Sequence, residues 1–130
     1  MNRTIKFRGY NLKNKQWIYG YYLVNRGKHY IVKDEVVEPF VEESDFEVDP
    51  ESVGQFVGVV GGIELYEGDI ANFVYGDNLL NLHGTVAWDD IYCQFKLRPG
   101  DYGGHLISTA VDLFKCVIHG NEYEKKLSNP

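Results

Sequence analysis

The sequence contains little cysteine and no long apolar run, and both absences exclude classes of protein. Only two cysteines occur in 130 residues, Cys93 and Cys116, and no CxxC pair is present. A disulfide scaffold or a cysteine-based zinc or redox motif is therefore a poor explanation, and two packed thiols are the ordinary interpretation. No apolar run approaches the roughly 20 residues of a membrane helix, and the N-terminus has no apolar signal core. We expect a cytoplasmic protein without a membrane partner.

Recognisable catalytic and metal-binding motifs are also lacking. The four histidines, His29, His83, His105 and His119, show neither HxH nor HExxH spacing, although folding could still bring them together. There is no GxSxG motif, and the GVVGG segment lacks the GK[ST] of a phosphate-binding loop. Cys93 falls in an alternating apolar register that predicts a buried, inert thiol. We expect no catalytic residue, no metal and no cofactor, and predict that the protein is not an enzyme.

Two acidic segments are the remaining candidates for chemistry: YEGD, with Glu67 and Asp69, and the pair Asp89–Asp90. Paired carboxylates would suit acid–base catalysis, or a metal site if a histidine folded beside Asp89 and Asp90. However, Gly68 and Asp69 have the chemistry of a turn, and adjacent residues of a strand point to opposite faces. We therefore interpret both segments as turns between strands.

The charge balance is acidic, and the two signs are separated along the chain. The formal net charge of −6 predicts repulsion from nucleic-acid phosphates. Residues 1–33 contain basic side chains and no acid, whereas residues 34–51 contain acids and no base. We expect the two segments to pair within the fold or across a subunit contact, which would occupy the basic side chains.

Short segments with glycine-rich turns between them favour β-structure. Aromatic residues make up 15% of the chain and 14 residues are glycine, and aromatic side chains pack well on a pleated surface. Strand-like runs occupy residues 4–11, 16–24, 29–33, 55–60, 62–66, 69–75 and 84–98. Most of them alternate apolar and polar residues, and no long amphipathic helix is visible. We predict an all-β fold with little helix.

Three of the expected β segments have particular features. The run at residues 16–24 carries large side chains on both faces, which predicts a strand that is covered on both sides or at least flanked by aromatic residues. Pro39 confines the EVVEPFV segment to a sheet edge or an irregular stretch. After Asp89–Asp90, the apolar residues Ile91 and Cys93 begin an alternation that predicts the second strand of a hairpin.

Residues that are typical of turns indicate where strands end and where the chain divides into two parts. The NRGK segment at residues 25–28 and the pair Gly61–Gly62 predict tight hairpin turns. VDPESV predicts one helical turn that is capped by Asp49 and has Pro50 at its first position. We interpret this turn as a connector, which gives an N-terminal β subdomain at residues 1–53 and a second part at residues 54–130.

Four segments, in this order, resemble a known family: IKFRGYN, VDPESVGQFVGVVGGIELYEGDIANF, GTVAWDD and VIHGNEYE. Together they are similar to the YopX family of phage and prophage proteins. The resemblance implies an all-β protein, an SH3-like barrel at residues 54–130, and no established activity. The chain departs from the family pattern in three places. The loop at Val60–Gly62 is shorter, His119 interrupts the closing motif, and Glu122 replaces a residue that is commonly apolar.

Two hypotheses for function follow. The first is a phage-encoded, non-catalytic adaptor or self-assembling module that binds a protein partner or a second copy of itself. The second is a nucleic-acid-binding module, because basic side chains interleaved with aromatic ones suit single-stranded nucleic acid. In both hypotheses the expected binding residues are those of the basic N-terminal segment: Lys6, Arg8, Lys13, Lys15, Trp17 and Tyr19.

Overall fold

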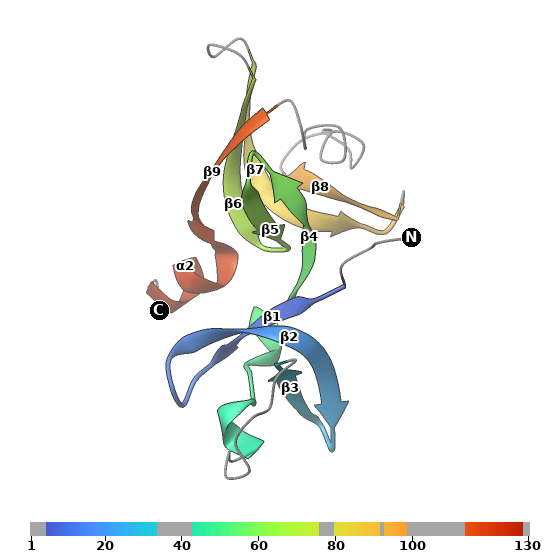
Figure 1. Ribbon diagram of the computed structural model, residues 1–130, viewed down its shortest axis with the longest axis vertical. Coiled ribbons are helices and arrows are strands. Elements are labelled where there is room, and N and C mark those ends of the chain that lie inside the picture. The colour runs from blue at the N-terminus through green and yellow to red at the C-terminus, as the bar shows by residue number, and fades with distance from the viewer. Residues whose placement is uncertain (1–4, 34–42, 76–79, 92, 99–113, 129–130) are drawn as a thin grey trace. The chain divides into compact units, whose positions relative to one another are not determined.

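The computed structural model describes residues 5–33, 43–75, 80–91, 93–98 and 114–128. Their contacts divide the chain into two compact units, residues 1–56 and 57–130, close to the division at residues 53 and 54 that the sequence suggested. The described residues are mostly antiparallel β-structure with one short α-helix, so the predicted fold class is confirmed (Figure 1). Two predictions fall outside these residues: the edge position of Pro39 and the placement of His105.

The N-terminal unit is built on three antiparallel strands. They are β1 (Phe7–Asn11), β2 (Gln16–Asn25) and β3 (Lys28–Val32). Strand β4 (Gly54–Val60) begins in this unit, where its first residues pair with β1. The turn between β2 and β3 has positive φ at both central residues, Arg26 and Gly27, as expected for the hairpin turn predicted there.

Strand β2 changes its partner halfway along its length. Its first half, as far as Gly20, pairs with β1, and its second half, from Tyr21 onward, pairs with β3. Figure 1 shows β2 as one long, curved strand. At the change of partner the backbone of β3 comes very close, since a Cβ atom built on Gly20 would lie 2.2 Å from the carbonyl oxygen of Val32. Glycine is therefore required at position 20.

The acidic segment folds back onto these strands through two short 3-10 helices, η1 (Glu43–Asp45) and η2 (Pro50–Ser52). Between them, the amide of Ile31 donates to the carbonyl of Phe46 at 2.9 Å. As predicted, η2 is capped by Asp49, whose carboxylate accepts from the amide of Glu51. The core of this unit is small and consists of Ile18, Ile31 and Val48, with Phe7 and Val53 packed against it.

The prediction that β2 is covered on both faces is wrong. Ile18 is buried, but Tyr21, Leu23 and Val24 are 58%, 52% and 51% exposed. Ile18, in the half of β2 that pairs with β1, is the one residue of this strand that belongs to the small core. Beyond Gly20, β2 and β3 continue as a hairpin whose apolar residues on β2 face solvent.

The C-terminal unit contains the remainder of β4 and five further strands. Strand β4 turns at Gly61–Gly62, both at positive φ, and pairs with β5 (Ile63–Tyr66), which confirms the predicted hairpin. The other four strands form a sheet in the order β8-β7-β6-β9. They are β6 (Asp69–Tyr75), β7 (Leu80–Asp89), β8 (Gln94–Arg98) and β9 (Phe114–Asn121).

Alternation along these strands sorts the side chains onto two faces of the sheet. Ala71 and Phe73 of β6 are completely buried, whereas Asn72 between them lies on the outer face. The inner face contributes to a core that is larger than that of the N-terminal unit. Its members are Val60, Leu65, Ala71, Phe73, Leu82, Val86, Leu97 and Cys116, with Val57 and Phe95 packed against them.

The chain passes from β9 into a short helix at an irregular point of the sheet. Ile70 pairs with Gly120 and Ala71 pairs with Ile118, so His119 is the extra residue of a β-bulge. Helix α2 (Glu122–Ser128) follows, and the side-chain oxygen of Asn121 accepts from the amide of Glu124 at 2.8 Å. At the residue that interrupts the closing sequence motif, the register between β6 and β9 thus shifts by one residue.

Neither sheet closes on itself within the part of the chain that is described, so the SH3-like barrel stays a prediction. The loop that was expected to be short, at Val60–Gly62, is the two-residue turn between β4 and β5. Among the described residues, no helix has the length and apolar character needed to cross a membrane.

Candidate functional site

The predicted binding residues of the basic segment lie in the N-terminal unit, mostly on one face of β1 and β2. Arg8 pairs with Tyr19, and Trp17 pairs with Tyr10, so these four side chains share a face. The guanidinium of Arg8 lies 4.8 Å from the centroid of the Trp17 ring. Arg8 itself is 7% exposed, and its cation is thus held against an aromatic ring inside the unit.

Two lysines of the basic segment, Lys6 and Lys13, are also engaged within the N-terminal unit. The ammonium of Lys6 lies 4.9 Å from the ring centroid of Phe56. Lys13 contacts the carboxylate of Asp45 and the hydroxyl of Ser44, each at 3.0 Å. These contacts agree with the expected pairing between the basic and acidic segments.

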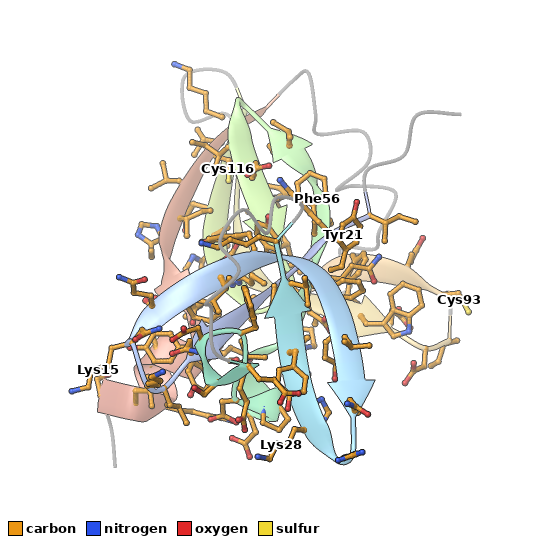
Figure 2. All side chains as sticks on the ribbon, turned by 60° about the horizontal axis from the view of Figure 1, so that its bottom comes forward. Lys15, Tyr21, Lys28, Phe56, Cys93 and Cys116 are labelled. Atoms are coloured by element: carbon orange, nitrogen blue, oxygen red, sulfur yellow. The ribbon has the colours of Figure 1, made fainter. Side chains whose placement is uncertain are left out.

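Lys15 occupies the turn between β1 and β2 with φ of 55° and is exposed, at the opposite end of β2 from Lys28 (Figure 2).

The described part of the acidic segment contacts the strands of the unit. Burial, and after it the charge and hydrogen bond of Glu43, raises the pKa of the Tyr30 hydroxyl. Among the described residues, Lys6, Arg8 and Lys13 are thus engaged within the unit, whereas Lys15, Arg26 and Lys28 are exposed.

A second surface was not predicted as a site and is the most exposed apolar one in the N-terminal unit. We call residues 21–24 of β2, Tyr-Tyr-Leu-Val, the β2 arm. The Tyr22 ring contacts Phe7 at 5.5 Å between centroids and stacks on His29 at 5.7 Å, whereas Tyr21, Leu23 and Val24 are more than half exposed. At the end of the same hairpin, Arg26 and Lys28 are both exposed, and Figure 2 shows Lys28 there. The arm therefore combines aliphatic and aromatic side chains with a basic tip.

The sequence did contain a signal for the β2 arm. Four consecutive large apolar residues follow Gly20 without a polar residue among them. Such a run was interpreted as a strand buried on both faces, which is one of its two possible meanings. The other is an exposed strand that binds a partner, and only the position of the small core distinguishes them.

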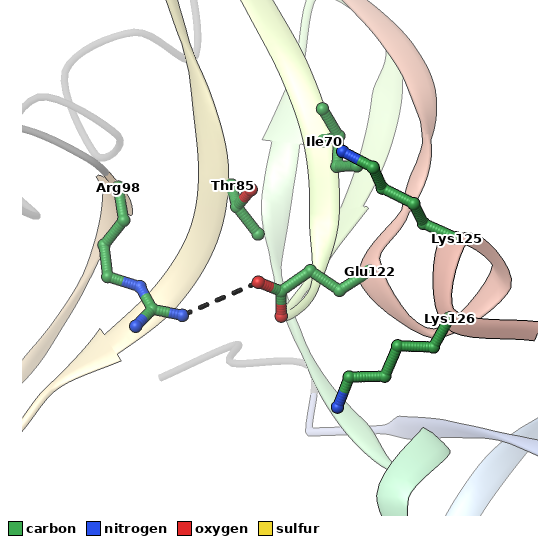
Figure 3. A pocket seen from close by; sticks show the side chains of 6 residues that line it. All are labelled: Ile70, Thr85, Arg98, Glu122, Lys125 and Lys126. Carbon is green, nitrogen blue, oxygen red and sulfur yellow. Dashed lines mark ion pairs between the residues drawn. The ribbon is translucent and has the colours of Figure 1, made fainter. Parts of the chain in front are cut away.

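The C-terminal unit contains a shallow pocket of about 570 Å³ on the outer face of its sheet. Ile70 and Thr85 form its floor, and three basic side chains and Glu122 surround them (Figure 3). The basic side chains are Arg98, Lys125 and Lys126. Arg98 and Glu122 form an ion pair at 3.7 Å with both side chains half exposed, so this pair adds little stability.

The two acidic segments that could have carried chemistry form turns. The carboxylate of Asp69 is buried and accepts from the amide of Tyr66 at 2.8 Å, and Gly68 has φ of 95°. Asp89 accepts from the amide of Ile91 at 2.9 Å and lies 3.5 Å from the ammonium of Lys96. Both predicted turns are confirmed, and both carboxylates are used in holding strand connections.

The predicted environment of Cys93 is wrong, whereas Cys116 is packed, as was expected of both thiols. The turn after Asp89 continues through Cys93, which has φ of 51°, so β8 begins only at Gln94. Cys93 is therefore exposed, and Ile91 is 85% exposed, because neither has joined the alternating strand. Cys116 is buried in the core of the C-terminal unit.

We expect a thiol reagent to modify Cys93 at once and Cys116 only when the C-terminal unit opens. Burial first, and the charge of Asp69 second, raises the pKa of the Cys116 thiol to about 11. At pH 8 only about one such thiol in a thousand is ionised, and the thiolate is the reactive form. Mass spectrometry after maleimide treatment should show one adduct on the native protein and two in denaturant. Rapid double labelling of the native protein would contradict this assignment.

Comparison with known proteins gives one match. A family model described as YopX protein matches residues 6–126, which is nearly the whole chain. No curated protein and no solved structure matches the chain. The matched range includes the segments that resemble the family, from the first strand to the helix that follows β9. The chain therefore belongs to the YopX protein family.

Proposed function

We propose that this protein is a non-catalytic interaction module that binds another protein through the β2 arm. The observation that carries the proposal is the exposure of apolar side chains on both faces of the arm, Tyr21 and Leu23 on one and Val24 on the other. Burying such side chains at an interface is favourable by about 25 cal/mol per Å² of apolar surface. Aromatic residues at the centre of an interface commonly contribute most of the binding energy.

The chemistry of the arm also specifies the partner. Apolar side chains lie along the strand, and the exposed cations Arg26 and Lys28 lie at its end. A complementary partner is a protein segment that presents apolar side chains followed by carboxylates, because opposite charges steer association and fix its register. The partner we propose is therefore an acidic, apolar segment of another protein.

Nucleic-acid binding by the basic segment is the second candidate. Arg8 and Trp17 lie together, as a stacking platform would require. However, Lys13 pairs with Asp45, Arg8 is buried, and the net charge is −6. These contacts engage two of the predicted cations, Lys13 and Arg8, and the net charge opposes binding to phosphates. We rank this candidate below protein binding.

A displayed library of random 12-residue peptides tests the proposal while the partner is still unidentified. We expect the full-length protein to enrich sequences with apolar residues next to Asp or Glu, and the Tyr21→Ser/Leu23→Ser variant to lose that enrichment. Ile91→Ser is the matched control, because Ile91 is exposed but lies in the C-terminal unit.

Three outcomes would overturn the proposal. One is the absence of any enriched peptide, and another is enrichment that the double variant retains. The third is a dimer, detected by light scattering, that the same double variant abolishes, since the arm would then bind a second copy of the chain. Salt-sensitive binding of a single-stranded oligonucleotide that Trp17→Ala removes would favour the second candidate instead.

We also propose a phage or prophage origin and a cytoplasmic setting. Membership of the YopX family supports the origin through the resemblance described above. Two free cysteines, one exposed, support a reducing compartment.

A further inference from the structure

Two histidines that lie far apart in the sequence meet on the outer face of the C-terminal sheet. His83 on β7 pairs directly with Asn72 on β6, and His119 on β9 is the extra residue of the bulge next to β6. The two imidazole rings lie 6.0 Å apart between centroids. Bulges commonly redirect a side chain beside a functional site, and here the bulged residue faces the centre of three adjacent strands.

The nitrogens of both rings converge on one atom. Nε2 of His119 lies 3.1 Å from Oδ1 of Asn72, and Nδ1 of His83 contacts the same oxygen. Because an amide oxygen only accepts, each of these nitrogens carries its proton in this arrangement. In the alternative tautomers, each ring carries its proton on its other nitrogen. The lone pairs of Nε2 of His119 and Nδ1 of His83 then point toward Oδ1 of Asn72.

Two imidazole nitrogens that approach one amide oxygen supply, once the side chains rotate, a ligand set for a transition-metal ion. Imidazole suits Zn²⁺, Cu²⁺ and Ni²⁺, and zinc sites with three protein ligands keep a further position for water. Within the described residues no group of three His, Cys, Asp or Glu could hold a metal. The third ligand in this set is Asn72, and asparagine is not one of those four residue types.

We propose that Asn72, His83 and His119 bind one divalent transition-metal ion, with Cu²⁺ bound more tightly than Zn²⁺. The side chains must move to bring both nitrogens to about 2.0–2.1 Å from the ion. This movement does not disturb the core, because Ala71 and Phe73 occupy the opposite face of β6 and both histidines are exposed. The order of the two metals follows the general ranking of divalent ions at nitrogen sites.

Nearby charges weaken the site without abolishing it. On the same outer face, Ile70 and Thr85 are the next cross-strand pair and belong to the pocket that is lined by Arg98, Lys125 and Lys126. Lys115 lies on β9 beyond Val117, which pairs with Asn72. These exposed cations are partly screened at physiological ionic strength, where the Debye length is about 8 Å. They also favour an anion in the open coordination positions.

Calorimetric titration of the full chain with Cu²⁺ and with Zn²⁺ tests the proposal. The chain should carry no affinity tag and should contain Cys93→Ser, since the exposed thiol would compete for metal. We expect one ion per chain, with at least tenfold weaker binding for His83→Ala and for His119→Ala. Asn72→Asp should bind more tightly, because it supplies a charged oxygen ligand in the same place.

His29→Ala is the matched control, because its ring is also engaged by a neighbouring side chain, Tyr22, but lies in the N-terminal unit. It should leave the titration unchanged. Electron paramagnetic resonance of the Cu²⁺ complex should report two coordinated nitrogens in the parent chain and one in each histidine variant. Absence of binding at 1 mM metal would overturn the proposal. Binding that survives the loss of both histidines, with circular dichroism showing a folded chain, would also overturn it.

Discussion

Replacing Gly20 with alanine should destabilise the N-terminal unit by about 3 kcal/mol or more, the upper end for overpacking. A Cβ atom at this position would lie 2.2 Å from the Val32 carbonyl oxygen and 2.9 Å from its carbon. Both are backbone atoms of the paired strand, so no side-chain rotation can relieve the contact. Either β2 and β3 separate at their point of closest approach or the hairpin that carries the β2 arm is lost.

The two tryptophans allow this effect to be measured in one unit at a time. Trp17 lies in the N-terminal unit and Trp88 in the C-terminal unit. In a Trp88→Phe background, the fluorescence of Trp17 during urea unfolding should show the loss of stability caused by Gly20→Ala. Gly58→Ala is the control, because its Cβ would meet nothing within 4 Å. An unchanged midpoint for Gly20→Ala would show that β2 and β3 do not approach this closely.

Phe73→Ala should have the largest effect in the C-terminal unit, a loss of about 3–5 kcal/mol. Phe73 is completely buried and is one of the largest members of its core, which also contains Leu65 and Cys116. Its removal takes away apolar burial and leaves a cavity lined by strands that cannot move together, because hydrogen bonds to β7 and β9 hold β6 in place.

The fluorescence of Trp88 in a Trp17→Phe background should show this loss as a lower urea midpoint. Val117→Thr provides the matched control, since Val117 is half exposed on the outer face of β9 and both residues are β-branched. Surface changes of this kind usually stay within about 0.5 kcal/mol. Equal destabilisation by the two substitutions would contradict the assignment of the inner and outer faces.

Local chemistry explains which parts of the fold could be predicted. Asp49 followed by Pro50 determines a cap whatever the rest of the chain does, and two consecutive glycines at residues 61 and 62 allow the positive φ angles of a two-residue turn. The turn in the YEGD segment is also determined by local chemistry. Its buried Asp69 accepts from the amide of Tyr66 three residues away, and such a contact is visible from the sequence.

Distant contacts explain the exposure of the β2 arm and the convergence of the two histidines, whereas the error at Cys93 is local. The exposure of the β2 arm follows from how far β1 and the small core extend along β2. Cys93 was predicted to lie in a strand because apolar side chains alternate around it. Instead, the turn that begins at Asp89 extends through Cys93, beyond the Asp89–Asp90 pair from which it was predicted. The convergence of His83 and His119 depends on a bulge that no spacing rule describes.

The contrast between the two thiols gives this protein a reporter of binding that requires no known activity. Cys116 reacts only through molecules whose C-terminal unit has opened, so its labelling rate measures the free energy of that opening. A ligand that binds the folded unit lowers the open population by the factor 1 + [L]/Kd, and labelling slows by the same factor. Exposed Cys93 supplies the internal standard. Candidate ligands of this unit can therefore be ranked by one thiol exchange measurement before any function has been assigned.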